Sequence, residues 1–501
     1  MIFLLLSAIV IITTLYLLKD WIRRFILAYR LPGPKGQVFM SEFQNNPALF
    51  FNNVRKWSKT YGPIYRLNFS YIYFTVNISG PEQLEKILLQ TKNNKKGQTY
   101  KFVTRWLGEG LLTSNGAKWQ KRRKILTPAF HFKMLEQFLN TFHAETKKLV
   151  KMLEKETQQP WTNILPIISK MALLSITDTA MGISLNEEES NADQKYIATI
   201  SQHRDVLFKR FTRPWLYRNF IYYTFTSLGR LEKKLISDLQ SFTDNIIKER
   251  KKTFKRFEID DETSWISSAF RKSKFVFLDI LLNANIYQQS IDDQGIRDEV
   301  NTFTFEGHDT TSVGMCLTLM LLANHKDYQN RIYLEIIDVI GDNLEPDINQ
   351  INKLKLMERF IKESLRLYPV LPFISRKLEE DITIDGYRLP KGILINIHLF
   401  DVHRNEKYWP DPEIFDPDRF LPENCINRHP LAYIPFSAGI RNCIGQKYAM
   451  LEIKAVLCGI LRHFILEPVD RPETIQFVPD LLLRPHDKML RVKFINRHVN
   501  N

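Results

Sequence analysis

Cys443 lies in a loop whose residues are those that a metal-ligating thiolate needs. The segment Phe436-Ser437-Ala438-Gly439-Ile440-Arg441-Asn442-Cys443-Ile444-Gly445 places glycines four residues before and two residues after the cysteine. Gly439 lets the backbone turn without a side chain against a large flat cofactor, and Arg441 can neutralise a carboxylate on the cofactor's edge. Phe436 can shield the sulfur, while backbone N–H groups and the start of the following helix favour the ionised thiol. The alternative is a buried free cysteine in a turn.

This loop, with its pattern F-x-x-G-x-R-x-C-x-G, resembles the haem-binding loop of the cytochrome P450 family of haem-thiolate monooxygenases. The resemblance implies a P450 fold, haem b as cofactor, and Cys443 as the ligand of the iron. It also implies that one oxygen atom of O2 is inserted into an unactivated C–H bond of an apolar substrate. Electrons would come from NADPH through a separate NADPH-cytochrome P450 reductase, with or without help from cytochrome b5. Two other functions stay open: a haem-thiolate isomerase or peroxide-rearranging enzyme that needs no reductase, and a non-catalytic haem-dependent lipid-binding or sensor protein.

A second set of residues could deliver protons to oxygen. Glu306 and Thr310 are four residues apart, so they share one helix face, and Asp309 is next to Thr310. Gly307 and the paired threonines should loosen the helix, because a threonine hydroxyl competes for the backbone carbonyl one turn earlier. By resemblance to the family's acid–alcohol pair, Asp309 and Thr310 are the predicted catalytic residues. The alternative is that the threonines only pack in a buried helix.

Glu306 indicates which branch of the cytochrome P450 family this chain resembles. The run Glu306-Gly307-His308-Asp309-Thr310-Thr311 is similar to the hallmark of the fourth P450 family, whose members hydroxylate fatty acids at the terminal carbon. Several of these members carry an ester between this glutamate and a haem methyl group. The hallmark usually has Asp and Met where this chain has Asn301 and Thr304. A buried carboxylate without a cation is costly and an ester removes its charge, so we expect Glu306 to be linked to haem. The resemblance to the fourth family also implies that the substrate is a fatty acid or similar lipid.

Haem propionates need cations, and four residues resemble those that the family uses. Trp119 and Arg123 are four residues apart on one predicted helix, and Arg376 follows the turn at Pro372 and resembles a strand arginine of the family. Together with Arg441 they are the predicted propionate ligands. Each of the arginines, taken alone, could instead form an ordinary salt bridge.

A further cluster is predicted from three charged residues. Glu363 and Arg366 have the spacing that puts both charges on one helix face, and Arg419 follows about fifty residues later in Asp416-Pro417-Asp418-Arg419-Phe420. In the family such residues form a buried Glu–Arg–Arg cluster near the cysteine loop. Without that context the first two would be a common surface pair of little energetic value.

Two other stretches could contact partners. Lys118, Lys121 and Arg122 form a basic patch that could dock an acidic electron donor, or they could simply be a solvated face. Residues 204–228 mix aromatic and basic side chains. This mixture indicates either a second membrane contact or a helix pair packed on the core.

The N-terminal run predicts a membrane anchor. The first eighteen residues are nearly all apolar, which at 1.5 Å per residue gives roughly 27 Å, enough for the thin endoplasmic reticulum bilayer. Basic residues follow the run from Lys19 onward instead of preceding it, which favours a retained anchor with a cytosolic body over a cleaved signal peptide. We expect the anchor at 1–20, a basic, proline- and glycine-containing linker at 21–36, and the catalytic domain at 37–501.

The net charge of +15, from 70 Lys and Arg against 55 Asp and Glu, suggests anionic partners. The charge is spread widely and no nucleic-acid motif accompanies it, so lipid headgroups and an acidic protein are favoured over nucleic acid. The four cysteines form no C-x-x-C pair, which argues against a zinc site or disulfide framework.

The residue pattern predicts a mainly α fold with small β-sheets behind an N-terminal transmembrane helix. Strands are expected at 64–69 and 71–78, and a strand–turn–strand unit from Ile382 through Asp385-Gly386 to Ile397. Helices are expected at 117–126, 132–155, 196–210, 229–252, 296–323, 326–340, 355–367 and 445–463.

Overall fold

The computed structural model describes residues 2–36, 38, 46–70, 73–185, 191–254, 276–286 and 289–497. The chain forms two compact units, each assembled from segments that are distant in sequence. The first unit comprises Met1–Thr99, Phe373–Pro412 and Arg428–Asn442, and the second comprises Tyr100–Pro372, Glu413–Asn427 and Cys443–Asn501.

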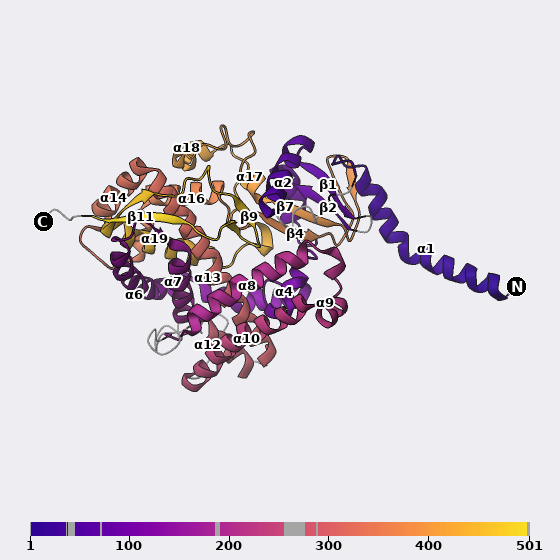
Figure 1. Cartoon of the computed structure of the whole chain (residues 1–501), viewed down its shortest axis with the longest axis horizontal. Coiled ribbons are helices and arrows are strands. Elements are labelled where there is room, and N and C mark those ends of the chain that lie inside the picture. The colour runs from indigo at the N-terminus through magenta and orange to yellow at the C-terminus, as the bar shows by residue number, and fades with distance from the viewer. Residues whose placement is uncertain are drawn as a thin grey trace. The chain divides into compact units, whose positions relative to one another are not determined.

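The first unit is organised around a four-stranded sheet with the strand order β1-β2-β7-β4 (Figure 1). The predicted strand pair is confirmed: β1 (Ile64–Ser70) and β2 (Tyr73–Ile78) run antiparallel. Tyr71 and Ile72, where the second strand was expected to begin, lie outside the described residues. β7 (Leu394–His398) runs parallel to β2 and antiparallel to β4 (Phe373–Lys377). The unit's helices are α1 (Ile2–Tyr29), α2 (Pro47–Tyr61), α3 (Pro81–Leu88) and α17 (Leu399–Val402).

The predicted strand–turn–strand unit is confirmed only in its first half. β5 (Ile382–Ile384) and β6 (Tyr387–Leu389) form a hairpin whose turn residues Asp385 and Gly386 have φ of +49° and +80°, as a two-residue hairpin turn requires. The chain then leaves the hairpin, and β7 joins the larger sheet. Pro390 has no N–H to offer a ladder and Gly392 has a φ of +87°, which ends the pairing.

α1 extends past the predicted anchor and into the predicted linker. The residues after it are fastened to β1, because the Arg66 side chain donates to the carbonyl of Leu31 at 2.5 Å and the Arg66 backbone N–H donates to the carbonyl of Pro32 at 2.8 Å. Among the helices of the described part of the chain, none combines the length and apolar character needed to cross a membrane.

The second unit is mainly helical, and all of the predicted helices are confirmed. Its strands make two small sheets, β3-β11-β8 and β10-β9. The helices are α4 (Tyr100–Leu107), α5 (Gly116–Leu126), α6 (Phe132–Glu156), α7 (Ile164–Thr179), α8 (Ala192–Phe211), α9 (Asn219–Phe225), α10 (Ser227–Thr253), α12 (Phe277–Ile286), α13 (Asp293–Asn324), α14 (Lys326–Ile340), α15 (Ile348–Lys353), α16 (Lys355–Leu367), α18 (Pro422–Cys425) and α19 (Gln446–His463). The strands are β3 (Thr162–Asn163), β8 (Phe464–Pro468), β9 (Phe477–Pro479), β10 (Leu483–Pro485) and β11 (Arg491–Asn496).

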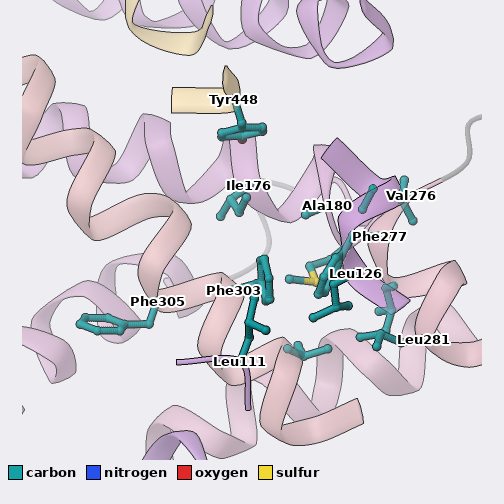
Figure 2. Close-up of a cluster of buried hydrophobic side chains, with 14 of the residues drawn as sticks. Leu111, Leu126, Ile176, Ala180, Val276, Phe277, Leu281, Phe303, Phe305 and Tyr448 are labelled. Carbon is teal, nitrogen blue, oxygen red and sulfur yellow. The ribbon is translucent and has the colours of Figure 1, made fainter. Parts of the chain in front are cut away.

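α13 is the central helix of this unit. It begins at a capped end, where the Asp292 carboxylate accepts from the Gly295 N–H at 2.9 Å. Phe303 and Phe305 leave the helix in different directions, and Phe303 packs with Phe277 of α12 at 4.3 Å between ring centroids (Figure 2). From Asp298 to Ala323 nearly every residue of α13 is buried, whichever face of the helix it occupies, as expected for a helix in the core.

Candidate active site

Cys443 is exposed and lies two residues before Gly445, the residue that caps the N-terminus of α19. A Cβ atom on Gly445 would lie 3.9 Å from the Cys443 Sγ and 3.9 Å from a ring carbon of Phe130. The glycine, the sulfur and this aromatic ring are therefore neighbours. The start of α19 carries a partial positive charge, which favours the thiolate.

The other cysteines are poor candidates for a thiolate ligand. Cys316 and Cys458 are buried, and burial raises the pKa of both thiols, that of Cys458 to about 12. Cys425 is half-buried and its thiol donates to the Arg419 carbonyl at 3.7 Å. All four cysteines lie in the described part of the chain, and Cys443 is the exposed one.

The half of the loop that precedes Cys443 belongs to the first unit. Gly439 has a φ of +71°, and a Cβ atom there would collide with the carbonyl of Leu88, so glycine is required on two grounds. Phe436 is half-buried and Arg441 is buried. Arg376 of β4 is also buried in this unit, and its guanidinium donates to the Ser375 carbonyl at 3.0 Å.

On α5, Trp119 is buried and Arg123 is half-buried. Burial lowers the pKa of Arg123, and the charge of Cys443 acts in the opposite direction. This electrostatic contact places the Arg123 guanidinium in the neighbourhood of the sulfur. The structure thus brings two of the predicted cofactor-binding residues together within the second unit.

One face of α13 differs from the rest of the helix. All residues of α13 are described, and between Asp298 and Ala323 only Glu306, Gly307 and Thr310 are partly exposed. These three share a face at helical spacing. Glu306 is therefore half-buried, less enclosed than most of the residues around it on α13.

The predicted competition for backbone carbonyls is present on that face. The Thr310 hydroxyl donates to the Glu306 carbonyl at 2.6 Å, and the Thr311 hydroxyl donates to the Gly307 carbonyl at 2.8 Å. Gly307 also permits close helix packing, because a Cβ atom there would lie 2.7 Å from the Ile176 side chain of α7.

Asp309 makes contacts that the sequence analysis missed. Its carboxylate accepts from Nη1 of Arg204 on α8 at 2.9 and 3.1 Å, and it also pairs with Arg484 of β10. Burial alone would raise the pKa of Asp309, but the two arginines outweigh it and hold the pKa well below its usual range. Asp309 is therefore an ionised, clamped carboxylate in this structure. Arg484 itself could have indicated a buried acidic partner, because it directly follows three leucines in the sequence.

The Glu363, Arg366 and Arg419 side chains form one cluster. Arg366 donates to both carboxylate oxygens of Glu363, at 2.7 and 2.8 Å, and the Arg419 Nε lies 3.6 Å from the same carboxylate. Glu363 and Arg366 are fully buried. The Asp416 backbone N–H donates to Glu363 at 2.9 Å, which ties the segment before Arg419 to α16.

The basic patch of α5 is smaller than predicted, because Arg122 is buried. Its Nε lies 3.7 Å from an oxygen of Glu299, a fully buried residue of α13. The other oxygen of Glu299 accepts from the Leu111 N–H at 3.0 Å. Burial raises the pKa of Glu299 to about 8. Arg122 is thus part of the interior, while Lys118 and Lys121 remain exposed.

Residues 204–228 pack on the core, as one of the two alternatives predicted, and a membrane contact of the same stretch stays a prediction. Arg210 is buried with Tyr223, whose hydroxyl accepts from the Arg210 guanidinium at 3.2 Å and donates to Glu232 at 2.9 Å. Trp215, Phe220 and Phe225 are instead exposed, by 61% to 73%. The stretch therefore packs on the core through its buried residues and presents aromatic side chains to the outside.

A model of the family described as Cytochrome P450 matches residues 31–492. Among curated relatives, a probable cytochrome P450 4ac1 from Drosophila melanogaster is 39% identical over 455 residues, which cover 90% of this chain and 87% of the relative. Cytochrome P450 4c3 from the same organism is 37% identical over 483 residues, covering 93% and 89%. Cytochrome P450 4V2 from Mus musculus is 40% identical over 424 residues, covering 83% and 79%. This chain belongs to the cytochrome P450 family, and its resemblance to the fourth family is confirmed.

Family membership confirms haem with a cysteine thiolate on its iron as the cofactor, and a monooxygenase as the class of enzyme. The candidate site residues of this chain are of the types that bind haem. Cys443 is an accessible thiol at a helix start, and Gly439 leaves the loop backbone free of a side chain. Within the second unit, Arg123 lies close enough to Cys443 for their charges to interact, and it offers the positive charge that a propionate needs.

Proposed function

We propose that this protein is a membrane-bound, NADPH- and O2-dependent monooxygenase that hydroxylates a fatty acid or similar lipid at or near its terminal carbon. The observation that carries the proposal is the partly exposed face of α13, where Glu306, Gly307 and Thr310 interrupt the otherwise buried stretch from Asp298 to Ala323. A carboxylate and a hydroxyl on one face provide polar groups for oxygen chemistry in apolar surroundings. The proposed electron source is a separate NADPH-cytochrome P450 reductase, as the likeness to the cytochrome P450 family suggests.

In this proposal the residues around Cys443 and those on the face of α13 have different tasks. Haem, when bound, supplies the iron that binds and activates O2. Cys443 would donate negative charge to the iron, and Trp119, Arg123, Arg376 and Arg441 would hold the propionates. On α13, the Thr310 hydroxyl donates to a backbone carbonyl and can turn away from it to offer its proton for oxygen activation. Asp309 would replace that proton.

Reduction in the presence of carbon monoxide separates this proposal from its rivals. A thiolate-ligated haem should give the long-wavelength absorption band of this family, and replacing Cys443 by serine should abolish it. NADPH consumption that needs reductase, O2 and an apolar substrate would then exclude both an isomerase and a binding protein. Substrate binding without NADPH consumption would contradict the proposal.

Glu306 is expected to carry an ester to a haem methyl group. The proposal is supported by the likeness to the fourth family and by the half-buried position of Glu306 on the same face of α13 as Thr310. Acidified organic solvent should therefore fail to extract all of the haem from enzyme that has turned over. Haem should be fully extracted from Glu306→Ala, and complete extraction from the wild type after turnover would contradict the link.

Membrane association through the N-terminal helix and a cytosolic body at the endoplasmic reticulum stay predictions, as do the domain boundaries. The aromatic side chains of α9 and its flanks support a second contact, because exposed Phe and Trp side chains lower their free energy by entering a bilayer interface. Lys118 and Lys121 are both exposed and could contact an acidic electron donor, although Lys118 also pairs with Glu109 at 2.5 Å.

Trp215 is expected to be in contact with lipid. In full-length protein reconstituted in vesicles, lipids that carry a fluorescence quencher should quench part of the tryptophan emission. Trp215→Phe keeps the apolar surface but removes the fluorophore, so the quenchable fraction should fall. Trp161→Phe is the matched control, since Trp161 is also exposed, by 41%, in the same unit. An equal quenchable fraction in the wild type and Trp215→Phe would place this surface away from the membrane.

A further inference from the structure

Asp309 shares its two arginines with a second carboxylate. Asp480 lies in the turn between β9 and β10, and its oxygens are 3.7 Å from the Arg204 Nε and 3.9 Å from the Arg484 Nε. Each guanidinium therefore directs its Nε toward Asp480 and a terminal nitrogen toward Asp309. Two carboxylates and two arginines, from α8, α13, β10 and the turn before β10, form one buried cluster, in which the two acids are called the Asp309–Asp480 pair.

The two carboxylates differ in their access to solvent. The Asp309 side chain is 3% exposed, whereas that of Asp480 is 14% exposed. Beside the cluster lies Asp205 of α8, a more exposed carboxylate that pairs with Lys488 at 2.6 Å. Asp480 thus occupies the side of the cluster that protons from water can reach.

The two carboxylates also differ in proton affinity. The charged groups that face Asp480 are Arg204 and Asp205 from α8, Asp309 from α13 and Arg484 from β10. Burial raises the pKa of Asp480 to about 6 against the pull of the arginines, with the two neighbouring aspartates adding to the rise. Asp309 is held ionised by the same arginines. One proton bound to the pair therefore resides on Asp480 at rest.

We propose that Asp480 is the proton donor that reprotonates Asp309 from the solvent side, with Arg204 and Arg484 as positioning residues. The inference rests on the proposed function, in which Asp309 supplies protons to Thr310. In the transfer, a proton leaves a carboxyl oxygen of Asp480 and binds a carboxyl oxygen of Asp309, and the negative charge moves the other way. Asp480 then takes a proton from water.

The arginine geometry makes this exchange feasible. Asp309 has the lower proton affinity as long as both guanidiniums face it, so the transfer needs at least one of them to shift. Arg484 already contacts both carboxylates, and a rotation of its guanidinium toward Asp480 stabilises the new anion while it releases the old one. The charge of the cluster stays constant throughout, which keeps the electrostatic cost in a low-dielectric interior small.

Asp480→Asn removes the titrating group and keeps the side-chain shape. In the wild type, the infrared carbonyl band of a protonated carboxyl should grow as the pH falls through about 6, and it should be missing from Asp480→Asn. Asp480 holds its proton below that pH and loses it above, so product formed per NADPH should decline as the pH rises through the same range. In Asp480→Asn this pH dependence should vanish, and coupled turnover at pH 6 should fall about tenfold, which is less than a directly positioned acid contributes.

Two further variants distinguish loss of the proton donor from a structural effect of the substitution. Asp480→Glu should restore the pH dependence, and Asp487→Asn, an exposed aspartate two residues beyond β10, should behave as the wild type. If Asp309→Asn uncouples the enzyme but Asp480→Asn keeps the wild-type pH profile, the donor role of Asp480 is overturned while the proposed function stands. If Asp309→Asn leaves coupling unchanged, the proton route of the proposed function fails, and the inference fails with it.

Discussion

Glu363→Ala is expected to give protein without bound haem. The substitution leaves the Arg366 guanidinium fully buried with its two strongest hydrogen bonds removed, and it also deprives Arg419 and the Asp416 N–H of their acceptor. Removing one partner of a buried pair costs about 3–5 kcal/mol, which is a large part of the 5–15 kcal/mol that stabilises a typical domain. The measurement is the haem content of the purified protein together with its free energy of unfolding.

Glu358→Ala on the same helix is the matched control. Glu358 pairs with Lys362 at 2.8 Å and Lys454 at 2.9 Å, and its side chain is partly exposed. Such pairs contribute up to about 1 kcal/mol each, so this variant should keep its haem. Equal haem content in the two variants would show that the Glu363 cluster does not maintain the cofactor-binding fold.

Asp309→Asn is expected to lower product formation about a hundredfold, because a positioned proton-transfer group contributes about 10² to 10⁴. NADPH consumption should continue, with reduced oxygen released as peroxide instead of product. The measurement is the ratio of product to NADPH consumed, with peroxide determined in the same samples.

The control for Asp309→Asn is Asp293→Asn, at the exposed start of the same helix. Haem content must be compared as well, because the Asp309→Asn substitution leaves Arg204 and Arg484 with Asp480 as their remaining carboxylate. The ion pairs of Asp309 stabilise the fold above its unfolded pKa of 3.8, and this contribution is lost as the pH falls. A folded, haem-loaded Asp309→Asn with unchanged coupling would remove Asp309 from the proton route.

Sequence periodicity predicted helices well where one face is polar. α14 and α16 begin and end where the pattern placed them. α7 and α12 were missed because their apolar residues are not confined to one face, and burial on all sides leaves no stripe for a periodicity test to detect. The strands of the second unit were missed for another reason: most are three to six residues long, and the partners of β3, β8 and β11 are distant in sequence.

The candidate site was predictable where the chemistry depends on local spacing. The cysteine loop and the Glu306–Thr310 face are each contained in a few consecutive residues. The arginine clamp on Asp309 was not predictable, because it joins α8, α13 and β10, and nothing local indicates that they meet. Arg122 shows the converse error: a basic residue among lysines was assigned to the surface, although the structure pairs it with the buried Glu299.

The central claim is that Cys443 and the open face of α13 form the two sides of one oxygen-activating site. Its most direct test is turnover of the purified protein with reductase, NADPH, a fatty acid and isotopically labelled O2. We predict an alcohol at or near the terminal carbon that carries one labelled oxygen atom, and no such product from Cys443→Ser. An oxygenated product without label, or NADPH consumption that never yields labelled alcohol from any apolar substrate, would contradict the account.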